Sequence, residues 1–210
     1  LRGNESDEDE IFVRKLAKEY QFQLHVKHFD TQMHAAKNKI STQMAARDLR
    51  YAWFYDLLAS ENAKYIAIAH HTNDDIETFF INLVRGSGLK GLLGIKEKID
   101  SIVRPLMAVS RAEIEQFLKE NDISFREDSS NASLQYLRNK IRHELMPLLA
   151  EMNPSIQQTI SDEMKILKGV AQIYYAKVGE VRKELIQNKN GIIQLKITAL
   201  LELNPLNNYL

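Results

Sequence analysis

Hydrophobic positions in the first part of the chain change between the period of a helix and that of a strand. Apolar residues three and four positions apart predict helices, and strict alternation of apolar and polar residues predicts a strand. The helices are expected at about residues 6–20, 42–60 and 74–85, the strands at 22–28 and 65–69, and a polar loop at 31–39. Ser41 is positioned to cap the second helix. This order of elements predicts a parallel sheet with crossover helices.

Glycines, prolines and capping residues divide the rest of the chain. Glycines between Gly86 and Gly94 end the third helix, and residues 104–106 are expected to be extended. The later elements are a helix over 110–121 opened by a capping box from Ser110 to Glu113, a strand and turn at 125–131, a helix over 134–149 kinked at Pro147, a helix from Pro154 to Leu185 with a core stripe at Ile160, Met164, Leu167, Ala171 and Tyr174, and a strand at 192–197 after Asn190-Gly191. We therefore expect an α/β domain with a doubly wound, mostly parallel sheet over residues 1–150, and a small, mainly helical domain over residues 151–210.

The composition is that of an ordinary globular protein. Hydrophobic residues make up 44% and charged residues 27% of the chain, and the formal net charge is zero, so any nucleic-acid contact must come from a local patch. The lack of cysteine excludes a disulfide framework, a Cys-ligated metal and a thiolate nucleophile, which fits a cytoplasmic protein. No apolar run approaches the ~20 residues that span a bilayer, and no secretory leader is visible. The chain starts at Leu1 without Met and stops at Leu210 within an ordinary pattern, so we expect a longer parent protein.

The strongest chemical signal is the stretch at residues 69–78, which joins a strand to the helix that follows. Thr72 or Asn73 is expected to cap this helix, whose first turn includes Asp75. The polar side chains that share one face on a helix are His70, Asp74 and Glu77. Taken singly, each acid could be an ordinary residue of a first helical turn, and the histidine could be an ordinary loop residue. As a group at the carboxyl end of a strand, they predict a ligand site.

Arginines are paired at two further places. Arg47 and Arg50 lie about one turn apart on a predicted helix, where two guanidinium groups can fork around phosphate oxygens; surface arginines also serve solubility alone. Arg138 and Arg142 share a face of another helix. They suit either an ion-pair network, with the acids at 127–128 close by in sequence, or contacts with a phosphate backbone. The residues by themselves leave both alternatives open at both places.

Six segments within residues 1–149 match, in order, the motifs of one known family. They are Leu1–Asp7, Ala46–Tyr51, His70–Thr78, Arg85–Leu92, Arg104–Leu106 and Arg126–Arg142. As a set they resemble the tRNA(Ile)-lysidine synthetase family, within the PP-loop ATP pyrophosphatase group. The resemblance implies the α/β fold of the adenine nucleotide α-hydrolase-like proteins. It also implies a ligase that uses ATP to adenylate the wobble cytidine in the CAU anticodon of tRNA(Ile) and then joins L-lysine to it, giving lysidine.

The resemblance implies roles for individual residues as well. Asp74 and Glu77 would bind the lysine amines or help to deprotonate the attacking one, and His70 would line the same pocket. The residues that would hold ATP are Arg47 and Arg50. The residues that would steady the tRNA backbone or the active-site wall are Arg104, Arg126, Arg138 and Arg142. Mg2+ would accompany ATP, with Asp75 as a candidate contact, and the implied partners are tRNA(Ile), L-lysine and a second copy in a homodimer, with no membrane.

One departure from the family and three rival hypotheses remain. The family's pyrophosphatase loop, Ser-Gly-Gly-x-Asp-Ser, would lie upstream of Leu1, so we expect this segment alone to be inactive. The first rival takes residues 70–75 as a two-metal phosphohydrolase cluster of His70, His71, Asp74 and Asp75. The second is a tRNA-thiolating relative, which the lack of cysteine disfavours. The third is a non-catalytic tRNA-binding module that uses the basic helix at 138–142.

Overall fold

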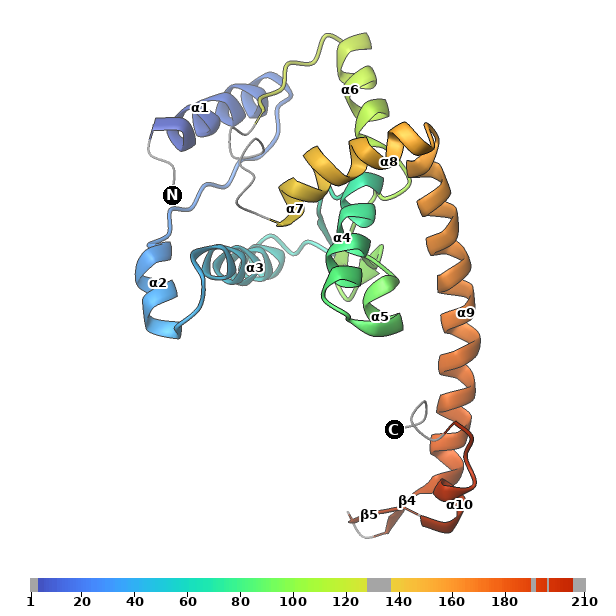
Figure 1. The fold of residues 1–210 in the computed structure, drawn as a ribbon. Helices are drawn as coiled ribbons and strands as arrows, with labels where there is room; N and C mark the ends of the chain where they lie inside the picture. The colour runs from blue at the N-terminus through green and yellow to red at the C-terminus, as the bar shows by residue number, and fades with distance from the viewer. Residues whose placement is uncertain (1–3, 128–136, 190–191, 196, 206–210) are drawn as a thin grey trace. The chain divides into compact units, whose positions relative to one another are not determined.

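The computed structural model describes residues 4–127, 137–189, 192–195 and 197–205 (Figure 1). The chain divides into two units. The first unit comprises residues 1–68, 98–105 and 116–128, and the second comprises residues 69–97, 106–115 and 129–210. Each unit collects segments that are far apart in sequence. Long-range packing, rather than chain order, therefore defines both.

Three helices and a small sheet form most of the first unit. These elements are α1 (Asn4–Glu19), α2 (Thr31–Asn38), α3 (Thr42–Ser60), β1 (Ile66–Ala67), β2 (Lys98–Ile99) and β3 (Ile102–Val103). The sheet order is β1-β3-β2, with β1 parallel to β3 and β2 antiparallel to it. Helix α3 has the bounds expected from its sequence, because Ser41 Oγ accepts a hydrogen bond from the Met44 N–H at 3.2 Å.

Two predictions for the first unit are wrong. Residues 22–28 alternate like a strand but form none; Gln23 instead donates a hydrogen bond to Glu61 at the end of α3, at 3.2 Å. Alternation describes side chains, whereas a strand also needs a neighbouring strand for its backbone groups. Residues 31–38 were expected to be a loop but form α2. Asp30 caps it by accepting the Met33 N–H at 2.8 Å, and Lys39 ends it in the left-handed conformation.

The sheet is shorter and more mixed than the sequence predicts. The strand expected at 65–69 is confirmed at its centre, where Ile66 and Ala67 pair in parallel with β3. The chain between β1 and β3 passes through helices, as a parallel connection requires. However, β2 pairs antiparallel with β3, so the sheet is not purely parallel. Residues 125–127 form no strand, and the remainder of the strand and turn expected at 125–131 lies outside the described residues.

The second unit is mostly helical. Its elements are α4 (Thr72–Val84), α5 (Gly88–Leu92), the first residues of α6 (Arg111–Glu120), α7 (Leu137–Lys140), a π-helical turn η2 (Ile141–Leu145), α8 (Met146–Met152), α9 (Ile156–Leu185), β4 (Ile186–Lys189), β5 (Ile192–Leu195) and α10 (Ile197–Leu201). β4 and β5 form an antiparallel hairpin, which confirms the strand expected there. The capping box is also confirmed: the Ser110 N–H donates to the Glu113 carboxylate at 2.7 Å, and Ser110 Oγ accepts the Glu113 N–H at 3.2 Å.

The core of the second unit lies where α4 packs against α9. Ile76 of α4 and Ile160 and Met164 of α9 are its buried centre, with Met146 of α8 against them. This confirms the apolar stripe expected on α9, whose Ala171 is also buried. Although α9 is 30 residues long, neither it nor any other described helix is apolar enough over a sufficient length to cross a membrane.

The helix expected at 134–149 is interrupted near Pro147, as predicted, and the interruption is the turn η2. Met146 donates its N–H to the Ile141 carbonyl, five residues back, so the turn is wider than an α-helical one. Proline has no N–H, and its ring collides with the carbonyl four residues earlier, here that of His143. The wider turn relieves this collision, and Arg142 is one of its residues.

Candidate active site

Helix α4 begins differently from the sequence prediction. His71, not Thr72 or Asn73, is its N-cap, and the Asp74 carboxylate accepts the His71 N–H at 3.1 Å. Thr72 instead holds the segment that follows β3, donating its hydroxyl to the Met107 carbonyl at 3.0 Å. The expectation that His70 shares a helix face with Asp74 and Glu77 is therefore wrong, because His70 precedes the helix. It is half-buried two residues before the first turn.

Asp74 and Glu77 form an ion-pair cluster with Arg138 and Arg142, which we name the acid–arginine cluster. Arg142 makes a two-pronged contact with Glu77: its Nε donates to Oε1 at 2.6 Å and its terminal nitrogen donates to Oε2 at 3.0 Å. Arg138 Nε lies 3.6 Å from Glu77 Oε2, and both guanidinium groups come within 3.9 Å of Asp74 Oδ1. The carboxylates are buried, with side-chain exposures of 12% for Asp74 and 4% for Glu77.

The two arginines of the cluster are held with different firmness. The hydrogen bond and charge of Glu77 raise the pKa of Arg142 above its already high ordinary value, so this guanidinium stays charged. Arg138 donates a hydrogen bond to the Thr78 hydroxyl at 3.1 Å, and that hydroxyl donates to the Asp74 carbonyl at 2.7 Å. The ion-pair alternative for Arg138 and Arg142 is thus realised, with partners on α4.

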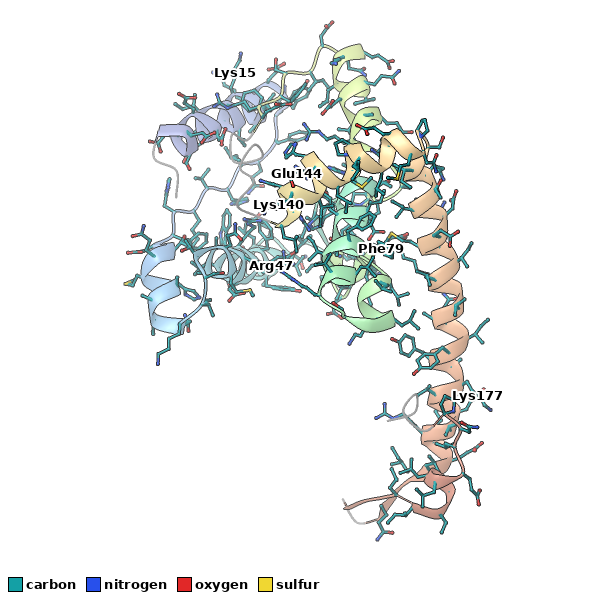
Figure 2. The ribbon with its side chains drawn as sticks, in the orientation of Figure 1. Lys15, Arg47, Phe79, Lys140, Glu144 and Lys177 are labelled. Carbon is teal, nitrogen blue, oxygen red and sulfur yellow. The ribbon has the colours of Figure 1, made fainter. Side chains whose placement is uncertain are left out.

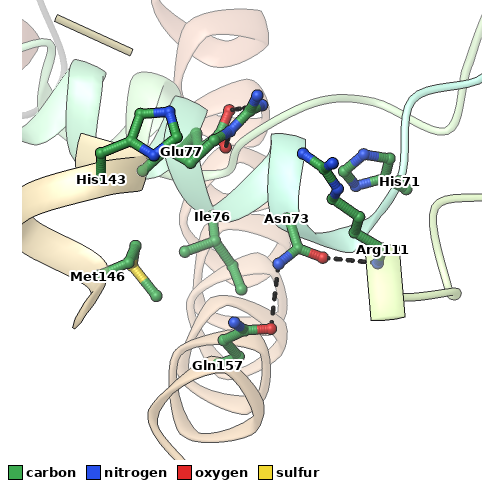
Figure 3. A pocket seen from close by; sticks show the side chains of 9 residues that line it. His71, Asn73, Ile76, Glu77, Arg111, His143, Met146 and Gln157 are labelled. Atoms are coloured by element: carbon green, nitrogen blue, oxygen red, sulfur yellow. Dashed lines mark hydrogen bonds and ion pairs between the residues drawn. The ribbon is translucent and has the colours of Figure 1, made fainter. Parts of the chain in front are cut away.

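A cavity of about 200 Å³ lies beside the cluster (Figure 3). The residues around it are His71, Asn73, Ile76, Glu77, Arg111, Arg142, His143, Met146 and Gln157. Asn73 links α4 to both α6 and α9. Its Oδ1 accepts the Arg111 N–H at 2.9 Å, and its Nδ2 donates to Gln157 at 3.1 Å. His71 Nδ1 is buried without a hydrogen-bond partner among the described residues. The cavity thus has acidic, basic and neutral polar walls and suits a small charged molecule.

Asp75 belongs to a different environment from Asp74. Its carboxylate accepts the Ile95 N–H at 2.5 Å and lies 3.4 Å from Lys168 of α9. Burial raises the pKa of Asp75 above its ordinary value, and the Ile95 hydrogen bond and Lys168 oppose that rise. Gly94 has a φ of +69°, and any side chain there would collide with the Asp75 carboxylate.

These contacts do not fit a magnesium site at Asp75. Its oxygens already accept from a backbone N–H and face a lysine, whereas Mg2+ needs oxygen ligands arranged around it. Within the part of the chain that the structure describes, no group of three His, Asp or Glu side chains could hold a metal ion. Asp74 and Asp75 also point to different partners, which disfavours the two-metal phosphohydrolase.

The other arginines named from the sequence lie in the first unit. Arg47, labelled in Figure 2, and Arg50 are exposed on α3. The Arg47 guanidinium lies over the Tyr51 ring, 4.7 Å from its centre. Arg104, directly after β3, is buried, which suits a place in a wall better than a contact with tRNA. Arg126 pairs with Glu8 and Asp9 of α1, each at 2.8 Å.

Sequence reasoning missed several residues that complete these sites. Lys168 is one helical turn beyond Met164 of the core stripe, and that spacing was the available signal for its approach to α4. Asn73 was considered only as a cap, and Gln157 and Arg111 carried no signal of their own. Their roles depend on contacts between segments 38 and 84 residues apart.

The chain matches known proteins over most of its length. Residues 1–149 match the family model described as the PP-loop domain. The chain belongs to the PP-loop domain family. Its relatives include the tRNA(Ile)-lysidine synthase of Bacteroides thetaiotaomicron, 42% identical over 202 residues, which are 96% of this chain and 46% of that protein. Proteins of the same name from Porphyromonas gingivalis (strain W83) and Parabacteroides distasonis are 46% and 39% identical, over 83% and 96% of this chain and 38% and 45% of their own lengths.

These matches confirm the resemblance found from the motifs. The chain spans less than half the length of the curated relatives named above. Membership of the PP-loop domain family implies the α/β adenine nucleotide α-hydrolase fold and ATP binding. The α/β class is thereby confirmed. The described sheet of the first unit has three strands, so the doubly wound sheet stays a prediction.

Proposed function

We propose that the full-length protein joins L-lysine to the wobble cytidine of the CAU anticodon of tRNA(Ile), with ATP as co-substrate, giving lysidine. The observation that carries the proposal is the buried acid pair Asp74 and Glu77, of which Glu77 lines the cavity of about 200 Å³. A pair of carboxylates suits a substrate that carries an amine. The relatives similar to this chain are named tRNA(Ile)-lysidine synthase. The PP-loop domain supports ATP as the activating substrate.

The proposed reaction has two steps. The oxygen on C2 of the cytosine first attacks the α-phosphorus of ATP, and diphosphate leaves. The neutral side-chain amine of lysine then attacks C2; a C–N bond forms, the C2–O bond breaks, and AMP leaves with that oxygen. The amine must lose protons for this sequence, so a carboxylate near it serves both to bind the ammonium form and to accept a proton.

The described residues divide these tasks between them. Asp74 and Glu77 would bind the lysine amines, and their burial strengthens the attraction to a cation. Arg142 would keep Glu77 oriented through its two-pronged contact. Arg47 and Arg50, exposed on α3, would hold ATP phosphate. The Tyr51 ring would keep the Arg47 guanidinium in position.

The remaining residues would serve the tRNA and the walls of the site. Arg104 would form part of the active-site wall, Arg126 would contact the tRNA, and His70 would line the same pocket as Asp74 and Glu77. The proposal also includes a cytoplasmic location, a homodimer, a doubly wound sheet completed in the full-length protein, and Mg2+ delivered with ATP. No step above depends on a metal ion bound by this chain.

The test is incorporation of labelled lysine by the full-length protein. Incubated with ATP, Mg2+ and an isoleucine tRNA with a CAU anticodon, the protein should leave label on the tRNA only when ATP is present and the wobble base is cytosine. Asp74→Ala and Glu77→Ala should each remove most of the label, whereas Glu144→Ala, an exposed acid on η2, should not. If the tRNA binds but no label is retained, the ligase proposal is wrong and a non-catalytic tRNA-binding module remains.

A further inference from the structure

The acid–arginine cluster is electrically balanced before any substrate enters. It contains two carboxylates, Asp74 and Glu77, and two guanidinium groups, Arg138 and Arg142, so these four formal charges sum to zero. His71 Nε2 also lies 3.5 Å from Asp74 and adds a positive charge only when it is protonated. Under the function proposed above, a lysine ammonium comes to the same carboxylates. A third cation in a largely buried site would be uncompensated, which is unfavourable in a low dielectric. The departure of one arginine from its carboxylates would restore the balance when lysine binds.

The structure indicates which arginine that is. Arg142 donates two short hydrogen bonds to Glu77, at 2.6 and 3.0 Å, and its side chain is 21% exposed. Arg138 approaches the same carboxylates only to 3.6 and 3.9 Å, and 40% of its side chain is exposed. Two-pronged hydrogen-bonded pairs are strong, whereas longer and more exposed ion pairs contribute little. Arg138 is therefore the more weakly held of the two arginines.

We propose that Arg138 is an exchangeable counter-ion: lysine displaces it from Asp74 and Glu77, and the freed guanidinium binds a phosphate of the tRNA substrate. The fork of N–H donors on a guanidinium matches phosphate oxygens, and contacts of this kind position a nucleic-acid backbone. When lysine is bound, the Arg138 guanidinium is available to a tRNA phosphate. Without lysine, it stays paired with Asp74 and Glu77. By linkage, tRNA must improve the affinity for lysine by the same factor.

The experiment measures this coupling in the full-length protein at one fixed salt concentration, without ATP so that no turnover occurs. The dissociation constant for tRNA is measured with and without saturating lysine, and that for lysine with and without tRNA. Wild-type protein should show equal tightening in both directions, by about 5-fold or more, which is the lower end of typical coupling between sites. Arg138→Gln should bind lysine more tightly than wild type in the absence of tRNA, and its coupling factor should fall to about one.

Lys140→Gln is the matched control. Lys140 is an exposed cation two residues along the same helix and has no part in the cluster (Figure 2). Its replacement should weaken tRNA binding at most and leave the coupling factor at the wild-type value. Arg138→Lys keeps the charge without the fork and should retain part of the coupling.

The outcomes separate this inference from the function on which it rests. Coupling that survives in Arg138→Gln, or weaker lysine binding by that variant, overturns the exchange. A wild-type protein that forms lysidine with a coupling factor of one also overturns it, because lysine binding then makes no cation available to tRNA, while the proposed function stands. A wild-type protein that binds no lysine and forms no lysidine overturns both.

Discussion

Glu77→Ala removes one side of the most tightly bonded ion pair in the cluster. The variant leaves the Arg142 guanidinium, 21% exposed, without its two-pronged partner. Breaking a buried pair on one side destabilises a protein by about 3–5 kcal/mol. We expect a value near the lower end, about 3 kcal/mol, because water reaches part of Arg142 and Asp74 stays 3.9 Å away. The double variant Glu77→Ala/Arg142→Ala leaves neither charge unpaired in this way, so the two substitutions should be strongly non-additive.

Amide hydrogen exchange in peptides of α4 measures this effect locally in the full-length protein. The opening free energy of α4 is determined for wild type, both single variants and the double variant, and the cycle gives a coupling energy. We expect about 2 kcal/mol, within the range for residues in one ion-pair network. Asp162 and Lys165 on α9, an exposed pair, provide the control cycle, which should show little coupling. A coupling energy below about 0.5 kcal/mol for Glu77 and Arg142 would refute the reasoning, since distant and independent sites reach that value.

Three further outcomes are expected. Pro147→Ala restores a backbone N–H and should let η2 become α-helical, which turns Arg142 away from Glu77. The Arg142 Nε–H, which its hydrogen bond protects in the wild type, should then exchange rapidly with water. The control variant Pro154→Ala should leave the exchange of this proton unchanged. Gly94→Ala should destabilise α4 by more than about 2 kcal/mol in the same exchange assay, because residue 94 has a positive φ and a Cβ there would collide with the Asp75 carboxylate. The raised pKa of Asp75 means that the folded state binds its proton more tightly than the unfolded state, so the contribution of this group to stability is full below its ordinary pKa of 3.8 and is lost as the pH rises through its higher folded pKa. Asp75→Asn should therefore gain stability relative to wild type as the pH rises above 3.8, and a constant difference across that range would contradict the assigned shift.

The elements that the sequence predicted well are those set by neighbours within one or two helical turns. Ser41 and Ser110 cap α3 and α6 through hydrogen bonds to residues three positions away, and such contacts can be read directly from residue types and spacing. The stripe on α9 follows equally from helical periodicity. The prediction of a strand at 22–28 was wrong because alternation of side chains does not specify a neighbouring strand. The prediction of a loop at 31–39 was wrong because it did not take account of Asp30 as a local cap.

The sequence by itself determined that Asp74, Asp75 and Glu77 begin one helix after a strand, and that Arg138 and Arg142 share a face of another. It did not determine how these groups pair. Successive residues on a helix point about 100° apart, so neighbouring acids can face different surroundings. Only tertiary packing gave Glu77 its partner 65 residues away on the helical segment before Pro147, and gave Asp75 a lysine 93 residues away on α9. The physical reason is that a buried carboxylate needs a cation or donors close by, and the fold, rather than the local pattern, decides which distant segment supplies them.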